Sequence, residues 1–83
     1  MFYVYVIFNK IASKIYIGQT QNIKARLLAH NNKHKTKSFT SKFEGEWELI
    51  YKESFTTRSE AIQRERSLKS AKGREYVKQF IPG

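Results

Sequence analysis

Residues 14–30 read KIYIGQTQNIKARLLAH and set the arrangement of the rest of the chain. The β-branched and aromatic residues at the start predict a short strand, Lys14–Ile17. We expect Gly18 to end this strand, at a point where a side chain would block close approach. The polar residues that follow favour a turn, with Thr20 or Asn22 as the N-cap of a helix.

The predicted helix carries two chemically useful side chains at the edge of its buried face. Ile23 and Leu27 form the apolar stripe, and Arg26 and His30 lie four residues apart along its border. Both are therefore expected at the rim of whatever the helix packs on. Solvated helix charge is one interpretation of this pair. The other is a phosphate site, where a forked guanidinium meets a group that titrates near neutral pH.

Residues 2–8 read FYVYVIF and predict the central strand of a sheet. The residues are β-branched or aromatic throughout, which is typical of a strand covered on both faces. A loop at residues 9–13 would join it to Lys14–Ile17 as an antiparallel hairpin. Tyr5 and Tyr16 then lie on neighbouring strands, where a tyrosine often packs its ring and leaves its hydroxyl at the edge. Ordinary core packing is the simplest interpretation of either residue taken alone.

A basic loop is expected after the first helix. Residues 31–45 have no clear period, and structureless connections beyond about 12 residues are uncommon in compact domains unless they are functional. The lysines expected to contact nucleic acid are Lys24 on the helix and, in the loop, Lys33, Lys35, Lys37 and Lys42. His34 is expected to contact phosphate or solvent. Phe39 and Phe43 lie between these lysines and could stack on exposed bases.

Residues 47–52 alternate in character and predict a third strand. The alternation places Trp47, Leu49 and Tyr51 on one face, because successive side chains of a strand point to opposite sides. This strand is expected to complete a small sheet with the two strands of the hairpin.

Two further helical segments are expected after the third strand. Thr57–Glu60 has the spacing of a capping box, and the helix it starts should run to about Ser70, with Gly73 as its punctuation. Residues 75–81 form a last amphipathic segment. The order β-β-α-β-α-α predicts an α/β (α+β) fold over residues 1–83, as one domain with a three-stranded antiparallel sheet flanked by helices.

Glu65 is the sharpest anomaly in the predicted helices. Helical geometry places its carboxylate in the middle of an apolar face, where a charge needs a partner. An ion pair with Arg64, Arg66 or Lys69 would explain it, as would a helix rotated so that the carboxylate is exposed. The third interpretation is a metal or catalytic role. One carboxylate in a chain with no Cys and no Asp cannot build a tetrahedral zinc site, but it can hold Mg²⁺ together with water and substrate phosphate.

The composition indicates a polyanionic partner. Sixteen Lys and Arg residues against seven acidic ones, all of them Glu, give a formal charge of +9. Such an excess favours phosphate contacts with counterion release, although solubility alone would also explain it. Because the chain lacks cysteine and its longest apolar run is far shorter than the ~20 residues of a membrane span, we expect a soluble cytoplasmic protein.

Taken together, these residues resemble the GIY-YIG nuclease family. Its first motif corresponds to Tyr3-Val4-Tyr5, with Tyr3-Val4 in place of Gly-Ile, and its second is intact as Tyr16-Ile17-Gly18. The family's arginine, histidine and glutamate match Arg26, His30 and Glu65. The likeness spans nearly the whole chain and is strongest to the small stand-alone bacterial members.

Two positions depart from patterns seen within the family. Some larger relatives have an asparagine late in the domain, whereas this chain has none after Asn32. Repair-type members often carry a lysine after the second motif, where this chain has Gln19. These departures bear on the rate and the proton route and leave the five matched positions in place.

The resemblance implies a metal-dependent DNA endonuclease, with structure-specific cutting in repair or recombination as the finer expectation. Its catalytic residues, converging on one face, would be Tyr5, Tyr16, Arg26, His30 and Glu65. Glu65 would hold Mg²⁺ or Mn²⁺, and Arg26 would offset charge that builds on phosphorus. Tyr5 would orient or deprotonate water with help from Tyr16 and His30, and adjacent cations would have to stabilise its phenolate.

Two alternatives belong to other classes of protein. One is a non-cleaving nucleic-acid-binding or adaptor module that keeps the fold. The other is an RNA-binding basic protein, which predicts RNA affinity without metal dependence. A domain of this size has little room for a recognition unit of its own, so a partner protein that confers specificity is also expected.

Overall fold

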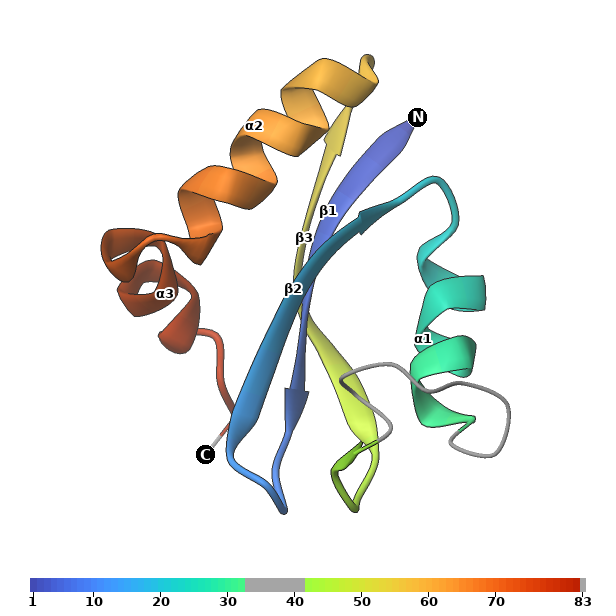
Figure 1. Ribbon diagram of the computed structural model, residues 1–83, viewed down its shortest axis with the longest axis vertical. Helices are drawn as coiled ribbons and strands as arrows, with labels where there is room; N and C mark the ends of the chain where they lie inside the picture. Colours follow the sequence, from blue (N-terminus) through green and yellow to red (C-terminus); the bar gives the residue numbers. More distant parts are fainter. Residues whose placement is uncertain (33–41, 83) are drawn as a thin grey trace.

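The structure is a computed structural model that describes residues 1–32 and 42–82. The strands are β1 (Phe2–Asn9), β2 (Lys14–Thr20) and β3 (Trp47–Phe55), and the helices are α1 (Ile23–Asn31), α2 (Arg58–Lys69) and α3 (Ala71–Lys78) (Figure 1). The predicted fold class and element order are confirmed, with β1 paired antiparallel to both neighbours in the sheet order β2-β1-β3. None of the helices in the described ranges has the length and hydrophobicity that a membrane crossing requires.

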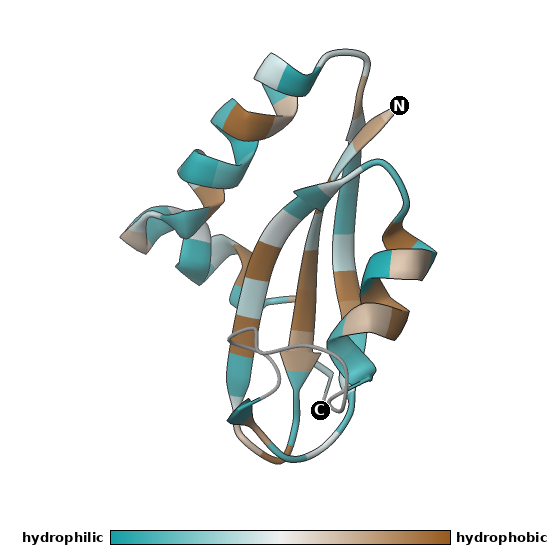
Figure 2. Cartoon of the chain, turned by 45° about the vertical axis from the view of Figure 1, so that its right-hand side comes forward, coloured by the Kyte–Doolittle hydropathy of each residue, from teal (hydrophilic) through white to brown (hydrophobic). Residues whose placement is uncertain are grey.

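The sheet separates two small hydrophobic cores. Helices α2 and α3 cover one face and α1 covers the other (Figure 1). Val4 and Val6 of β1 join the core under α2 and α3, whereas Tyr5 and Ile7 join the core under α1. In Figure 2 the apolar positions run along the strands and along α1. The central strand is therefore buried on both faces, as its continuous apolar sequence predicts.

The prediction that Tyr51 shares a face with Trp47 and Leu49 is wrong. The pairing of β3 with β1 shifts after Leu49, which leaves Ile50 as an extra residue without an opposite partner. Such a bulge turns the following part of the strand over. Trp47 and Leu49 pack in the core under α1, while the Tyr51 ring lies 4.9 Å from that of Phe80 on the other side of the sheet.

The β2 strand runs to Thr20 and does not end at Gly18, contrary to expectation. Gly18 lies opposite Tyr5 in the ladder, and a Cβ atom there would sit 2.8 Å from the Tyr5 hydroxyl oxygen. The missing side chain therefore makes room for a neighbouring ring and does not terminate the strand. Of the two predicted caps of α1, Asn22 is the one whose side chain accepts a backbone N–H bond from the first turn, at 3.0 Å.

The start of α2 follows the prediction, and the join between α2 and α3 does not. Thr57 and Glu60 exchange the side-chain-to-backbone hydrogen bonds of a capping box. As predicted, α2 ends close to Ser70, which is its C-cap, and Ser70 also caps the start of α3. The expected punctuation at Gly73 is wrong. Gly73 is instead buried inside α3, where a Cβ atom would lie 2.2 Å from a carbonyl oxygen of α2. A glycine here lets α3 fold back closely on α2.

Candidate active site

Three aromatic rings meet on the α1 side of the sheet. Tyr5 comes from β1, Tyr16 from β2 and His30 from the last turn of α1. The ring centroids of Tyr16 and His30 are 4.8 Å apart, and those of Tyr5 and His30 are 5.9 Å apart. A hydrogen bond of 2.8 Å joins the Tyr5 hydroxyl to His30 Nε2. Both partners are almost fully buried, so this contact is shielded from competing water.

The last turn of α1 is held against the sheet by a side-chain clamp. Asn31 Oδ1 accepts a hydrogen bond from Trp47 N at 2.7 Å, and Asn31 Nδ2 donates to Trp47 O at 3.0 Å. The amide thus pairs with the backbone at the start of β3, as a neighbouring strand would. Since Asn31 follows His30 directly, the clamp also fixes where the imidazole points.

Arg26 lies one turn before His30 and is exposed. Its guanidinium interacts with the Tyr5 hydroxyl, and this interaction is the main reason why the pKa of Arg26 is raised. Tyr16 acts on the same group in the same direction. The site therefore presents a permanent cation at its mouth, with its inner edge against the buried hydroxyl.

Burial shifts the pKa values of Tyr5 and His30 in opposite directions. It raises the pKa of the Tyr5 hydroxyl, and the hydrogen bond from Arg26 only partly offsets that shift. Burial lowers the pKa of His30, and the charge of Arg26 lowers it further. At neutral pH the site thus holds a protonated phenol beside a neutral imidazole. Arg26 alone does not create the phenolate that the resemblance would require.

Glu65 belongs to the other layer of the fold. Four of the predicted catalytic residues lie on the α1 side, but α2 packs against the opposite face of the sheet, so the expected convergence on one face does not hold. The negative charge of Glu65 still makes a small contribution to the raised pKa of Tyr5. The strand β2 lies at the edge of the sheet, and α2 packs on it. No further strand therefore lies between the α2 side chains and the site.

The Glu65 carboxylate has a partner within its own helix. Lys69 Nζ lies 2.7 Å from Glu65 Oε2, one turn along α2, and the Glu65 side chain is 20% exposed. Of the three predicted ion pairs this is the one that forms. Arg64 instead bonds Glu53 on β3, at 2.7 Å.

The predicted nucleic-acid contacts are described only in part. Lys24 on α1 and Lys42 before β3 are both exposed, which suits a contact with phosphate. Phe43 packs its ring 6.3 Å from that of Trp47 and is partly buried against the core under α1, which leaves less of the ring to stack on bases. The remaining predicted residues lie outside the described part of the chain: Lys33, His34, Lys35, Lys37 and Phe39.

Comparison with known proteins agrees with this arrangement. The family model described as the GIY-YIG catalytic domain matches residues 1–78.

The chain belongs to the GIY-YIG family.

Its similar proteins include a UPF0213 protein of Staphylococcus saprophyticus, 32% identical over 81 residues that cover 98% of this chain and 95% of the relative. A UPF0213 protein of Staphylococcus epidermidis is 33% identical over 69 residues, covering 83% and 82%. The solution NMR structure of the UPF0213 protein BH0048 from Bacillus halodurans shows the same fold, with a TM-score of 0.55 and 24% identity over 100% of this chain and 88% of that one.

The two GIY-YIG motifs face each other in the β1–β2 ladder. Tyr5, the tyrosine of the first motif, pairs with Gly18, the glycine of the second. That glycine leaves the space that the Tyr5 ring and hydroxyl occupy, with Tyr16 Cε2 also only 3.0 Å from where its Cβ would be. The motif pattern therefore has a steric basis in this chain.

The residues of the site fit a divalent ion held by few protein ligands. Among the described residues, no group of three His, Cys, Asp or Glu side chains comes together. Mg²⁺ is commonly bound by one or two carboxylates plus water and phosphate oxygens, and members of the GIY-YIG nuclease family typically use divalent metals. Glu65 is the carboxylate that acts on the site, so it can serve as that ligand if Lys69 releases it.

Two features of the site escaped sequence analysis. The Asn31 clamp could not be distinguished, because Asn31 and Asn32 both stand at the expected end of the helix and only the position of β3 decides between them. The second feature is a group of cations around the edge of β2, contributed by Lys14, Arg74 and Lys78. They belong to distant segments, so only the folded chain reveals that they gather.

Proposed function

We propose that this protein is a divalent-metal-dependent DNA endonuclease that hydrolyses a phosphodiester bond by direct attack of water. The observation that best supports this is the contact chain from Arg26 through the Tyr5 hydroxyl to His30 Nε2, whose last link measures 2.8 Å. It joins a cation suited to phosphate, a hydroxyl and a neutral imidazole in one small site. Membership of the GIY-YIG family supports the same reaction class.

We assign proton removal from the attacking water to Tyr5 and His30 acting together. The raised pKa of Tyr5 makes a free phenolate scarce, whereas the lowered pKa of His30 keeps its imidazole neutral and able to accept a proton. The Tyr5 oxygen would accept the proton of water while its own hydroxyl proton passes to His30 Nε2. Tyr16, with its ring 4.8 Å from that of His30, would keep the imidazole in place.

Arg26 is assigned to the phosphate itself. Its guanidinium is fixed at one end by the Tyr5 hydroxyl and is otherwise exposed, so it can donate to the oxygens of an incoming phosphate. Charge builds on these oxygens as water attacks phosphorus. A cation already held in position stabilises that charge without further reorganisation.

Glu65 is assigned to hold Mg²⁺ or Mn²⁺. When bound, the ion would supply Lewis-acid stabilisation of the nonbridging and leaving oxygens. Lys69 now holds the carboxylate at 2.7 Å and would have to turn away for this to happen. The Lys69 side chain is 49% exposed, so it has solvent into which it can turn.

Several finer aspects belong to the same proposal. The formal charge of +9 and the exposed Lys24 and Lys42 support DNA as the partner. We further propose structure-specific cutting linked to repair or recombination, a partner protein that confers specificity, and a cytoplasmic location. The small size of the chain supports the protein partner, and its lack of cysteine supports the location.

The Glu65→Gln variant tests the metal assignment. We expect wild-type protein to cut branched or linear DNA with Mg²⁺ or Mn²⁺ and to leave it uncut with a chelator. The variant should fall to the level of the chelator control, because an amide is a poor ligand for a hard cation. DNA binding, measured by fluorescence anisotropy, should be nearly unchanged. The matched control is Glu48→Gln, which removes the same charge from an exposed position of β3.

The result also separates the proposal from the two other classes of protein. Wild-type cleavage by Glu65→Gln would disprove the metal role of this carboxylate. DNA binding without any metal-dependent cut in the wild type would favour a non-cleaving module, for which the Glu65–Lys69 ion pair is a purely structural contact. Tighter binding to RNA, independent of metal, would favour the RNA-binding alternative.

A further inference from the structure

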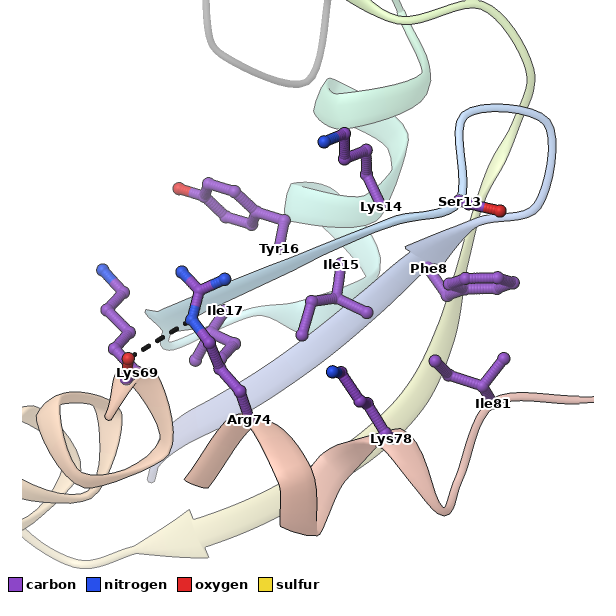
Figure 3. Close-up of a pocket in the computed structure, with 10 residues that line it drawn as sticks. All are labelled: Phe8, Ser13, Lys14, Ile15, Tyr16, Ile17, Lys69, Arg74, Lys78 and Ile81. Atoms are coloured by element: carbon purple, nitrogen blue, oxygen red, sulfur yellow. Dashed lines mark hydrogen bonds between the residues drawn. The ribbon is translucent and has the colours of Figure 1, made fainter. Parts of the chain in front are cut away.

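A groove of about 430 Å³ runs along the exposed edge of β2, between this strand and α3. Figure 3 shows Lys69, Arg74 and Lys78 rising from the helices toward the strand. On the strand, Ile15 and Ile17 point to the helices and form an apolar floor. The groove therefore combines apolar walls with charged side chains.

The charge of the groove has one sign. Its lining includes four cations, Lys14, Lys69, Arg74 and Lys78, and within the described part of the chain no carboxylate joins them there. Arg74 Nε donates to the Lys69 carbonyl oxygen at 3.3 Å, a bond that directs the guanidinium toward β2 (Figure 3). Lys78 also contacts Glu75 at 3.4 Å, but both side chains are more than half exposed and such pairs are weak.

The groove is continuous with the candidate active site. Tyr16 lines the groove and also packs its ring against His30 in the site. Lys69 lines the groove and at the same time bonds the Glu65 carboxylate. A chain-like anion that leaves the site past Tyr16 would thus meet the groove cations next.

The cations are spaced in a way that suits a repeating anion. Arg74 and Lys78 are one turn apart on α3, about 6 Å along its axis. Lys14 and Tyr16 lie two residues apart on β2, about 7 Å along the strand. Neighbouring phosphates of an extended nucleic-acid strand are separated on the same scale, whereas a single small anion would need converging donors.

We propose that this groove holds the sugar–phosphate backbone of one nucleic-acid strand that flanks the phosphodiester bound in the site. The idea rests on the proposed function. Lys14, Arg74 and Lys78 contact successive phosphates, and Ile15, which is only partly buried, packs against the sugars. The groove thus adds affinity for the flanking strand without any role in the chemical step.

Salt-dependent DNA binding by Lys14→Gln, Lys78→Gln and the double variant tests this proposal. Binding of a fluorescent DNA is followed by anisotropy over a range of NaCl concentrations, with a chelator present so that nothing is cut. Each lysine that contacts a phosphate contributes about one unit to the slope of log affinity against log salt. We expect each single variant to lower the slope by about one unit and the double variant by about two.

The matched control is Lys72→Gln, which removes the same charge from α3 at a position outside the groove lining. Its slope should stay close to wild type, and thermal melting should show that all variants are folded. Equal slopes for Lys72→Gln and Lys78→Gln, or unchanged slopes for the groove variants, would overturn the proposal. If the groove variants lower the salt slope as expected but the wild type cuts no DNA, the groove binds nucleic acid and the nuclease assignment is wrong. A wild type that does not bind DNA would overturn both.

Discussion

The Tyr5 hydroxyl is the atom on which the candidate site depends. It bonds His30 Nε2 at 2.8 Å, it fills the space left by Gly18, and its interaction with the Arg26 guanidinium lowers its pKa. Burial outweighs the cation and raises the pKa of Tyr5, so the hydroxyl is better suited to relay a proton than to store a negative charge. The general base of the proposed reaction is therefore the Tyr5–His30 pair and not the phenolate alone.

Replacing Tyr5 with Phe tests this assignment at the level of one atom. Cleavage should fall by about 10²–10⁴-fold, the range typical of losing a general acid–base group. The fold should persist, with a loss of about 1–3 kcal/mol because a buried imidazole nitrogen loses its partner. Single-turnover cleavage and urea unfolding measure the two effects. The matched control is Tyr3→Phe, two residues earlier on the same strand, which should retain activity. Full activity of Tyr5→Phe would show that the proton relay is wrongly assigned.

At the scale of elements, α1 owes its position to its two ends more than to its middle. Asn22 caps its start, and the Asn31 clamp ties its last turn to the first residue of β3 through two hydrogen bonds. Between them, Ile23 and Leu27 are only partly buried against the core. A helix with so narrow an apolar contact needs polar anchors to hold His30 in place.

The Asn31→Ala variant tests whether the clamp positions the imidazole. It removes both hydrogen bonds between the Asn31 side chain and the backbone of Trp47, so we expect a loss of about 1–3 kcal/mol in the free energy of unfolding. Cleavage should fall as well, even under conditions where the variant is fully folded. Urea unfolding and single-turnover cleavage are the measurements, and Asn32→Ala, at the exposed end of the same helix, is the control. Equal free energies of unfolding for Asn31→Ala and Asn32→Ala would show that the clamp does not stabilise the fold.

Elements with strong local signals were predicted well, and their joins were not. The capping box of α2, the choice of Thr20 or Asn22 as the cap of α1, and the doubly buried β1 follow from neighbouring residues alone. The bulge at Ile50 depends on how β3 pairs with β1, so no local pattern marks it. The role of Gly73 could not be predicted for the same reason, because this glycine allows α3 to pack closely on α2 and does not end a helix.

The candidate site follows the same division between local and tertiary information. Arg26 and His30 could be placed on one helix edge from their spacing, and Glu65 stood out on an apolar helix face. That Glu65 arrives from the opposite layer could not be foreseen, since it depends on which face of the sheet α2 covers. The groove cations Lys14 and Lys78 come from segments far apart in the sequence, and only the packing of α3 against β2 brings them together.

At the scale of the whole molecule, the site exists only in the complete fold. Its side chains come from β1, β2, α1 and α2, and the sheet separates the layer of α1 from that of α2. A chain of 83 residues has little core to spare, yet it buries a histidine to 3% exposure. The protonation state of the His30 imidazole therefore affects the free energy of unfolding as well as the proposed reaction.

This coupling predicts that stability falls when His30 must be protonated. Because burial and Arg26 lower the pKa of His30 in the fold, the unfolded chain binds a proton more readily as the pH drops through the ordinary histidine range. Above that range both states are neutral and His30 has no such effect. The urea midpoint should therefore be lower at about pH 5.5 than at about pH 7.5, a window in which carboxylates remain ionised.

The contribution of His30 can be isolated with two glutamine variants. His30→Gln can keep a hydrogen bond to the Tyr5 hydroxyl but cannot gain a proton, so its urea midpoint should change less between the two pH values than that of the wild type. The chain has two histidines, and His34→Gln is the control that should keep the wild-type pH dependence. Glu60, whose pKa is lowered by its bond from Thr57, acts only at more acidic pH and does not interfere. Identical pH dependence in wild type and His30→Gln would mean that the buried imidazole is not the titrating group.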